Sequence, residues 1–104
     1  MSPFRLEPIA LACALLSPGA ALAEDAPAVP ASVASCVSCH SADGNPLVAG
    51  VPILAGQRQD YLESALKSYR SGYRSGGMAD VMQIFAKPLT DKEIEEIATW
   101  FSAN

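Results

Sequence analysis

Two of the three cysteines and the only histidine of this 104-residue chain fall within five consecutive positions, Cys36-Val37-Ser38-Cys39-His40. A closed zinc site needs four ligands, and residues 24–104 offer only these two cysteines and one histidine. A thioredoxin-like redox pair belongs in a βαβ context, and no strand-like alternation precedes Cys36. A disulfide here would close a very small loop and stabilise little. The C-x-x-C-H pattern therefore favours covalent attachment of a c-type haem.

The spacing has a physical basis. Two cysteines three positions apart on a helical turn place both sulfur atoms on one side, where they can form thioethers with the two vinyl groups of the porphyrin. His40 follows directly, so its imidazole can reach the iron as the proximal ligand. A covalently held haem would also stabilise a chain whose own apolar core is small.

Residues 1–23 are typical of an export signal. Arg5 precedes the apolar stretch Ile9–Leu16, and the break at Pro18-Gly19 leads to a small-residue cleavage site, Ala21-Leu22-Ala23. Cleavage there leaves the 81 residues 24–104 and predicts a periplasmic location; the alternative is a retained N-terminal anchor. No later apolar run approaches the roughly 20 residues that span a bilayer, so no membrane span is expected in the mature chain.

The charge balance argues against nucleic acid as a partner. Residues 24–104 carry 6 basic and 10 acidic side chains, whereas a phosphate backbone requires a basic surface.

The mature chain is predicted to form one all-α domain of three to four helices. Residues 24–30 form a Pro-rich lead, and residues 41–56, rich in Gly, Pro, Asn and Asp, form a loop. Residues 31–104 make up the domain. Its expected helices cover residues 31–39, 57–71, 78–86 and 90–103. Gly72 ends the second of these helices, and Thr90 with Glu93 predicts a capping box at the start of the last.

With these motifs the chain resembles the small class I c-type cytochromes over most of residues 31–103. It looks most like the halves of cytochromes c4, the c5 and c553 types, and the cytochrome subunit of flavocytochrome c sulfide dehydrogenase. Ser41 departs from the Gly that many relatives have after the haem histidine. The segments that carry the resemblance are Cys36–His40, Asp43-Gly44-Asn45, Pro52–Gln57, Tyr61-Leu62, Leu66, Tyr69–Gly72, Met82, Ala86-Lys87 and Leu89-Thr90-Asp91.

The resemblance implies the cytochrome c fold, with one covalent haem c and its iron at the centre. The first and last helices would cross, with Trp100 or Phe101 closing the contact. Pro52 would offer its carbonyl to the haem histidine, and Leu54 and Ile53 would line the haem. Tyr61, Tyr69 and Arg70 are candidates for contacts with the haem propionates.

The sequence leaves several candidates for the second axial ligand of the iron. No other histidine lies in residues 24–104, which leaves Met78, Met82, a lysine or an open position. In the resembling cytochromes the ligand stands seven residues before the apolar residue that opens the Leu-Thr-Asp segment. Counting back from Leu89 selects Met82, with Met78 as the runner-up.

His/Met ligation would leave no site for a substrate and implies single-electron transfer by a carrier that is not itself an enzyme. Its partners would be other redox proteins. The alternative role is the haem-bearing electron-acceptor subunit of a periplasmic dehydrogenase such as flavocytochrome c sulfide dehydrogenase. A haem sensor or peroxidase with an open iron position is a further alternative. Residues 54–90 sum to +2 within an acidic chain, which predicts a mildly positive docking rim.

Overall fold

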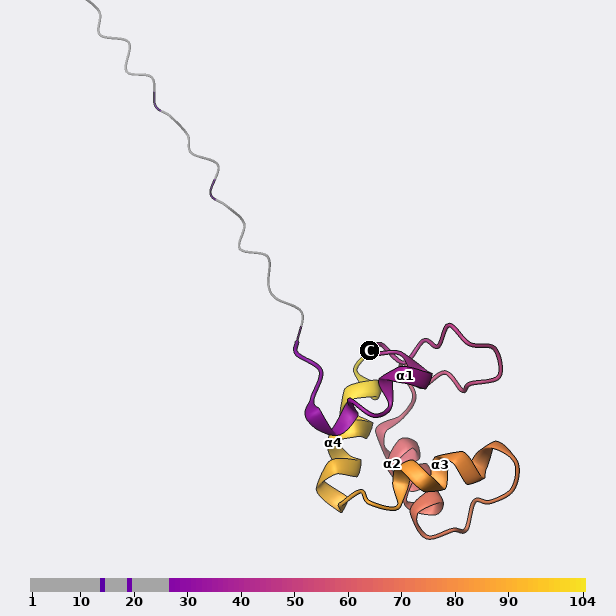
Figure 1. Ribbon diagram of the computed structural model, residues 1–104. Helices are drawn as coiled ribbons and strands as arrows, with labels where there is room; N and C mark the ends of the chain where they lie inside the picture. The colour runs from indigo at the N-terminus through magenta and orange to yellow at the C-terminus, as the bar shows by residue number, and fades with distance from the viewer. Residues whose placement is uncertain (1–13, 15–18, 20–26) are drawn as a thin grey trace, which may run out of the picture.

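The computed structural model describes residues 27–104 and the isolated positions 14 and 19. The predicted export signal (1–23) and the start of the Pro-rich lead (24–26) therefore fall outside the described residues, apart from those two positions. The described chain forms helices and loops without any strand, as the predicted all-α class requires (Figure 1). Its elements are η1 (Ala31–Val33), α1 (Val37–His40), α2 (Gln59–Arg70), α3 (Met78–Ala86) and α4 (Asp91–Ser102).

The first helix differs from the prediction, because residues 31–39 do not form one continuous helix. The amides of Ala34 and Cys36 donate to carbonyls only three residues back, and a regular α-helical turn begins at Val37. Ser and β-branched Val are weak helix formers, so this short segment takes the tighter 3₁₀ geometry instead. The break leaves Cys36 at the N-terminus of α1 and His40 at its last position.

The other helices lie close to their predicted ranges. Helix α2 begins two residues later than predicted, because Arg58 is still extended, and it ends just before Gly72, which has φ +80°. Helix α3 covers the predicted 78–86. The capping box at Thr90 is confirmed: its hydroxyl accepts from the Glu93 amide at 3.1 Å, and the Glu93 carboxylate accepts from the Thr90 amide at 3.2 Å.

The hydrophobic core joins the two ends of the domain. Val33 of η1 and Phe101 of α4 are both fully buried and belong to one cluster, so the predicted contact between the first and last helical segments is present. Trp100 lies beside this contact, and its indole N–H donates to the Ala42 carbonyl at 2.6 Å. The other buried members of the cluster are Leu62, Ile97 and Ala98.

The loop after α1 is tied down at its base. The Gly44 carbonyl accepts from the amides of Leu54 and Ala55 at 2.9 and 3.2 Å, and the Gly56 amide donates to Phe101 at 3.0 Å. These bonds hold the segment around Pro52 against α1. In the part of the chain that the structure describes, no helix is long and apolar enough to cross a membrane.

Candidate functional site

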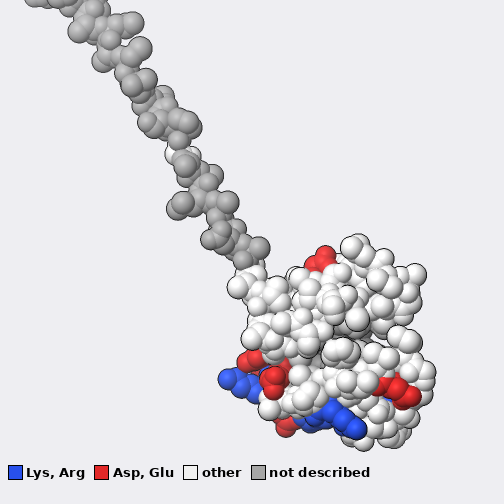
Figure 2. All heavy atoms as spheres, in the orientation of Figure 1, with Lys and Arg blue, Asp and Glu red and all other residues white. Residues whose placement is uncertain are grey.

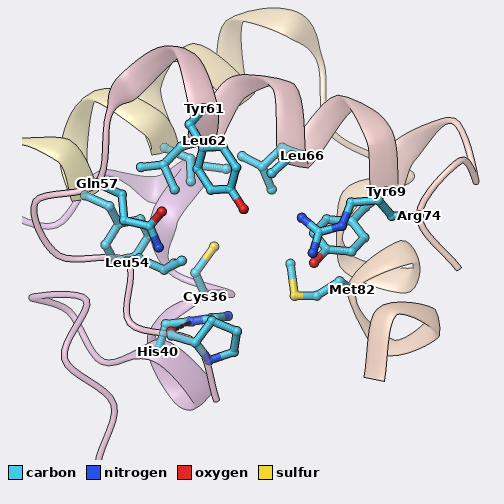
Figure 3. Close-up of a pocket in the computed structure, with 14 residues that line it drawn as sticks. Cys36, His40, Leu54, Gln57, Tyr61, Leu62, Leu66, Tyr69, Arg74 and Met82 are labelled. Atoms are coloured by element: carbon cyan, nitrogen blue, oxygen red, sulfur yellow. Dashed lines mark hydrogen bonds between the residues drawn. The ribbon is translucent and has the colours of Figure 1, made fainter. Parts of the chain in front are cut away.

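A cavity lies between α1, the 52–57 segment, α2 and α3 (Figure 3). Its walls are mainly apolar. A second hollow shares six of its lining residues, including Cys36, His40 and Met82, and extends the space toward the N-terminal end of α3. Besides Pro52 and Met82, the apolar side chains of the main cavity are Leu54, Leu62, Ala65, Leu66, Ile97 and Phe101.

His40 forms one wall of this cavity and is only 6% exposed. Its Nδ1 lies 2.9 Å from the Pro52 carbonyl oxygen. Because a carbonyl can only accept a hydrogen bond, Nδ1 must carry the proton, and in the neutral ring Nε2 then keeps a free lone pair. The imidazole is therefore oriented and in the tautomer that a metal ligand requires.

The two cysteines carry free thiols. Cys36 is half-buried and lines both hollows, whereas Cys39 is exposed and lines only the second one. Burial raises the pKa of the Cys36 thiol, and a hydrogen bond with Ser35 opposes that shift. Among the described residues no group of three or more His, Cys, Asp or Glu side chains is placed to hold a metal ion.

The two methionines of α3 occupy different positions. Met82 is half-buried and reaches into the main cavity, with Cys36 and His40 on the opposite wall (Figure 3). Met78 opens the helix four residues earlier; it is 72% exposed and lines only the second hollow. One helical turn thus separates a methionine that faces His40 from one at the rim.

The polar side chains that line the cavity differ in part from those that the sequence predicts. Tyr61 and Tyr69 line it, whereas Arg70 does not: its guanidinium donates to the Leu89 carbonyl at 3.1 Å and pairs with Asp91 at 2.7 Å. Arg74, which the sequence did not single out, lines the cavity instead. Ile53 is also outside the lining and is 58% exposed, so the expectation that it lines the haem is wrong.

Charged side chains cover only part of the molecule. In the view of Figure 2 they gather over the part that contains α2, α3 and α4, while the part with η1, α1 and the following loop is mostly uncharged. Three residues that line the second hollow, Met78, Val81 and Phe85, are exposed apolar side chains. Leu47, Val48 and Ile53 are also exposed, in the loop that supplies Gly50, Val51 and Pro52 to the same lining.

Comparison with known proteins assigns the family. The family described as cytochrome c matches residues 17–103, and the chain belongs to it. It is 43% identical over 81 residues to cytochrome c-554(548) of Halomonas halodenitrificans, an alignment covering 78% of this chain and 98% of that protein. The predicted resemblance and the all-α cytochrome c fold are thereby confirmed.

Two further relatives are longer than this chain. Cytochrome c4 of Stutzerimonas stutzeri is 37% identical over 87 residues, which cover 78% of this chain and 41% of the relative. The cytochrome subunit of sulfide dehydrogenase of Chlorobaculum tepidum is 37% identical over 67 residues, 64% of this chain and 57% of the relative. The chain therefore spans only about half the length of these two proteins.

The cavity fits the cofactor of this family. A c-type haem needs two thiols three residues apart, a histidine with a free ring nitrogen and an apolar space, and all of these meet at Cys36, Cys39 and His40. The family and the C-x-x-C-H spacing together identify this chain as a haem c protein that transfers electrons through the haem iron.

Proposed function

We propose that this protein carries single electrons in the periplasm, with Cys36 and Cys39 binding the haem and His40 and Met82 as axial ligands. The observation that carries the proposal is the position of Met82, which faces His40 across the cavity while the Pro52 carbonyl leaves the His40 Nε2 free. When bound, the haem supplies an Fe(III)/Fe(II) couple that exchanges one electron at a time.

Each group on this chain has a distinct task in the proposal. The hydrogen bond from Nδ1 to Pro52 holds the imidazole plane and increases the basicity of Nε2. The Met82 thioether is a soft ligand that favours the reduced metal. Leu54 and Leu66 keep water away from the site. With both axial positions taken by the chain, no position is left for a substrate.

The periplasmic location rests on the export signal that residues 1–23 predict. Periplasmic extraction of cells that express the full chain tests it, with mass spectrometry of the N-terminus. The expected mature chain begins at Glu24. A chain that remains in the membrane with residues 1–23 attached would support the retained anchor instead.

A subunit role is the second candidate, and an exposed apolar side chain of α3 outside the cavity favours it. Ile84 is 71% exposed and lines neither hollow. A permanent dehydrogenase partner would bury such a side chain, and the protein would copurify with that partner at high salt. A free shuttle would purify as a monomer, and its reaction with a redox partner would slow as the salt concentration rises.

The decisive experiment is an absorption spectrum of protein exported in a host that attaches haem c, with a haem stain on a denaturing gel. We expect haem that survives denaturation and a far-red Met–iron band in the oxidised protein. Covalent haem without the band would replace the Met82 assignment with an open or different ligand and favour a sensor or peroxidase. A colourless chain, beside a control cytochrome that acquires haem, would contradict the proposal.

A further inference from the structure

The two methionines of α3 differ in their access to solvent. Met78 and Met82 stand four residues apart, so they project from the same side of the helix. Met78 is exposed and lines only the second hollow, whereas Met82 is half-buried and reaches into the main cavity (Figure 3). Met78 is therefore the one exposed thioether among the described residues.

The segment before α3 leaves the Met78 side chain uncovered. Gly76 and Gly77 precede it, and a Cβ added to either glycine would have no atom within 4 Å. The start of the helix is nevertheless fixed, because the Gly76 amide donates to the Asp80 carboxylate at 2.8 Å and the Ala79 amide donates to the Gly76 carbonyl at 3.1 Å. The Met78 thioether is thus held at the second hollow in a position that small polar solutes can reach.

Met78 belongs to a row of apolar side chains along α3. Val81, Met82 and Phe85 follow it at helical spacing, and all four line the second hollow. Val81 and Phe85 are each 39% exposed, so Met78 is the most exposed member of the row. A polar atom on its sulfur would enter a row that otherwise contains only apolar side chains.

We propose that Met78 is a reversible oxidation site, at which a peroxide converts the thioether to a sulfoxide and makes this edge of α3 polar. A sulfur lone pair attacks one oxygen of hydrogen peroxide, and the S–O bond forms as the O–O bond breaks. The second oxygen leaves as hydroxide, which takes the proton from the first oxygen and becomes water. The sulfur loses two electrons and the peroxide gains them.

The inference goes beyond the proposed function, and only the protection of Met82 rests on that proposal. In the proposed site the Met82 sulfur donates a lone pair to the iron, so that lone pair is not available to a peroxide. Met82 is also half-buried. Oxidation at Met78 should therefore change the surface of α3 without removing the axial ligand.

The test treats the haem-loaded protein with hydrogen peroxide and locates the added oxygen by mass spectrometry of its peptides. We expect Met78 to be oxidised at least about tenfold faster than Met82, with the far-red Met–iron band unchanged. The oxidised protein should elute earlier from a hydrophobic phenyl column. Methionine sulfoxide reductases with a dithiol should restore both the mass and the elution position.

Met78→Leu and Met78→Gln are the matched controls. Met78→Leu keeps an apolar side chain of similar size but has no sulfur atom, so peroxide should change neither the mass at this position nor the elution. Met78→Gln introduces a polar side chain of similar length, and the untreated variant should elute like the oxidised wild type.

Equal oxidation rates at Met78 and Met82 would overturn the inference, as would a sulfoxide at Met78 that leaves the elution unchanged. Absence of the far-red band from the untreated protein would refute the Met82 ligation instead. The two proposals are tested separately, because the exposure of Met78 favours its oxidation with or without that ligation.

Discussion

The imidazole Nδ1 of His40 and the carbonyl oxygen of Pro52 lie 2.9 Å apart, and this hydrogen bond joins the end of α1 to the loop that follows it. The bond decides which ring nitrogen of His40 is protonated. It depends in turn on Gly44, whose carbonyl binds the amides of Leu54 and Ala55 and so holds the Pro52 segment close to α1.

Pro52→Ala should raise the reduction potential. The carbonyl remains, but the alanine backbone is freer and the hydrogen bond weaker, so the imidazole becomes less basic and stabilises Fe(III) less. We expect the Fe(II)/Fe(III) ratio at a fixed potential to rise by about two- to fivefold. Pro46→Ala is the control, since no hydrogen bond to its carbonyl is present among the described residues. An identical potential for both variants would show that Pro52 does not act through His40.

Met82→Ala should abolish the far-red Met–iron band of the oxidised protein, because the side chain that faces His40 is lost. Met78→Ala should keep the band, since Met78 is 72% exposed at the rim. Both variants should retain covalent haem on a denaturing gel. The reverse pattern would make Met78 the ligand.

Gly44→Ala should lower the free energy of unfolding by about 3 kcal/mol or more. Gly44 has φ +78°, and a Cβ there would lie 2.5 Å from the Ala55 amide nitrogen, so backbone would have to move. Gly50→Ala is the matched control, with φ +86° and no atom within 4 Å of the added carbon, and should cost only about 1 kcal/mol. Denaturant titration of the haem-loaded variants measures both. Equal losses would mean that the close approach to Ala55 carries no cost.

Asp91→Asn should lower the Tm at pH 7 by a small amount that vanishes in acid. The hydrogen bond and charge of Arg70 hold the pKa of Asp91 below its usual range. The folded state therefore binds this proton less readily than the unfolded chain, and the stabilisation is complete above the unfolded pKa of about 3.9. It is lost as the pH falls through the lower folded pKa.

Melting curves between pH 2 and 7 check this prediction, with Glu95→Gln as the control. Glu95 is an exposed carboxylate of the same helix and forms no ion pair within the described residues. The wild type and Asp91→Asn should converge at low pH, whereas Glu95→Gln should follow the wild type throughout. A difference that persists unchanged at pH 2 would assign the effect of Asp91→Asn to something other than its charge.

The features that the sequence predicts best are those formed by residues close together along the chain. The start of α4 follows from Thr90 and Glu93, because a capping box is formed within a single turn. The haem-binding chemistry follows from Cys36, Cys39 and His40 for the same reason. Residues 31–39 were predicted wrongly as one helix, because three-residue and four-residue hydrogen bonds differ little in energy in a short segment of Ser and Val.

A local sequence pattern cannot decide whether Arg70 or Arg74 lies at the cavity. Both are cations near the end of α2, and the sequence favoured Arg70. The structure turns Arg70 toward Asp91, 21 residues further along the chain, and leaves Arg74 at the cavity. That outcome depends on how α2 packs against α3 and α4.

The helical class, the cysteine pair and its histidine, and the cap of α4 thus follow from residues within a few positions of one another. Met82 and the Pro52 carbonyl were selected from the resemblance, whereas the cavity itself, the 2.9 Å distance from Pro52 to His40 and the presence of Arg74 in the lining come from the tertiary structure. The physical reason is that these relationships join separate segments, and only the packing of η1, α2 and α3 with α4 and the Gly44 contact sets their distances.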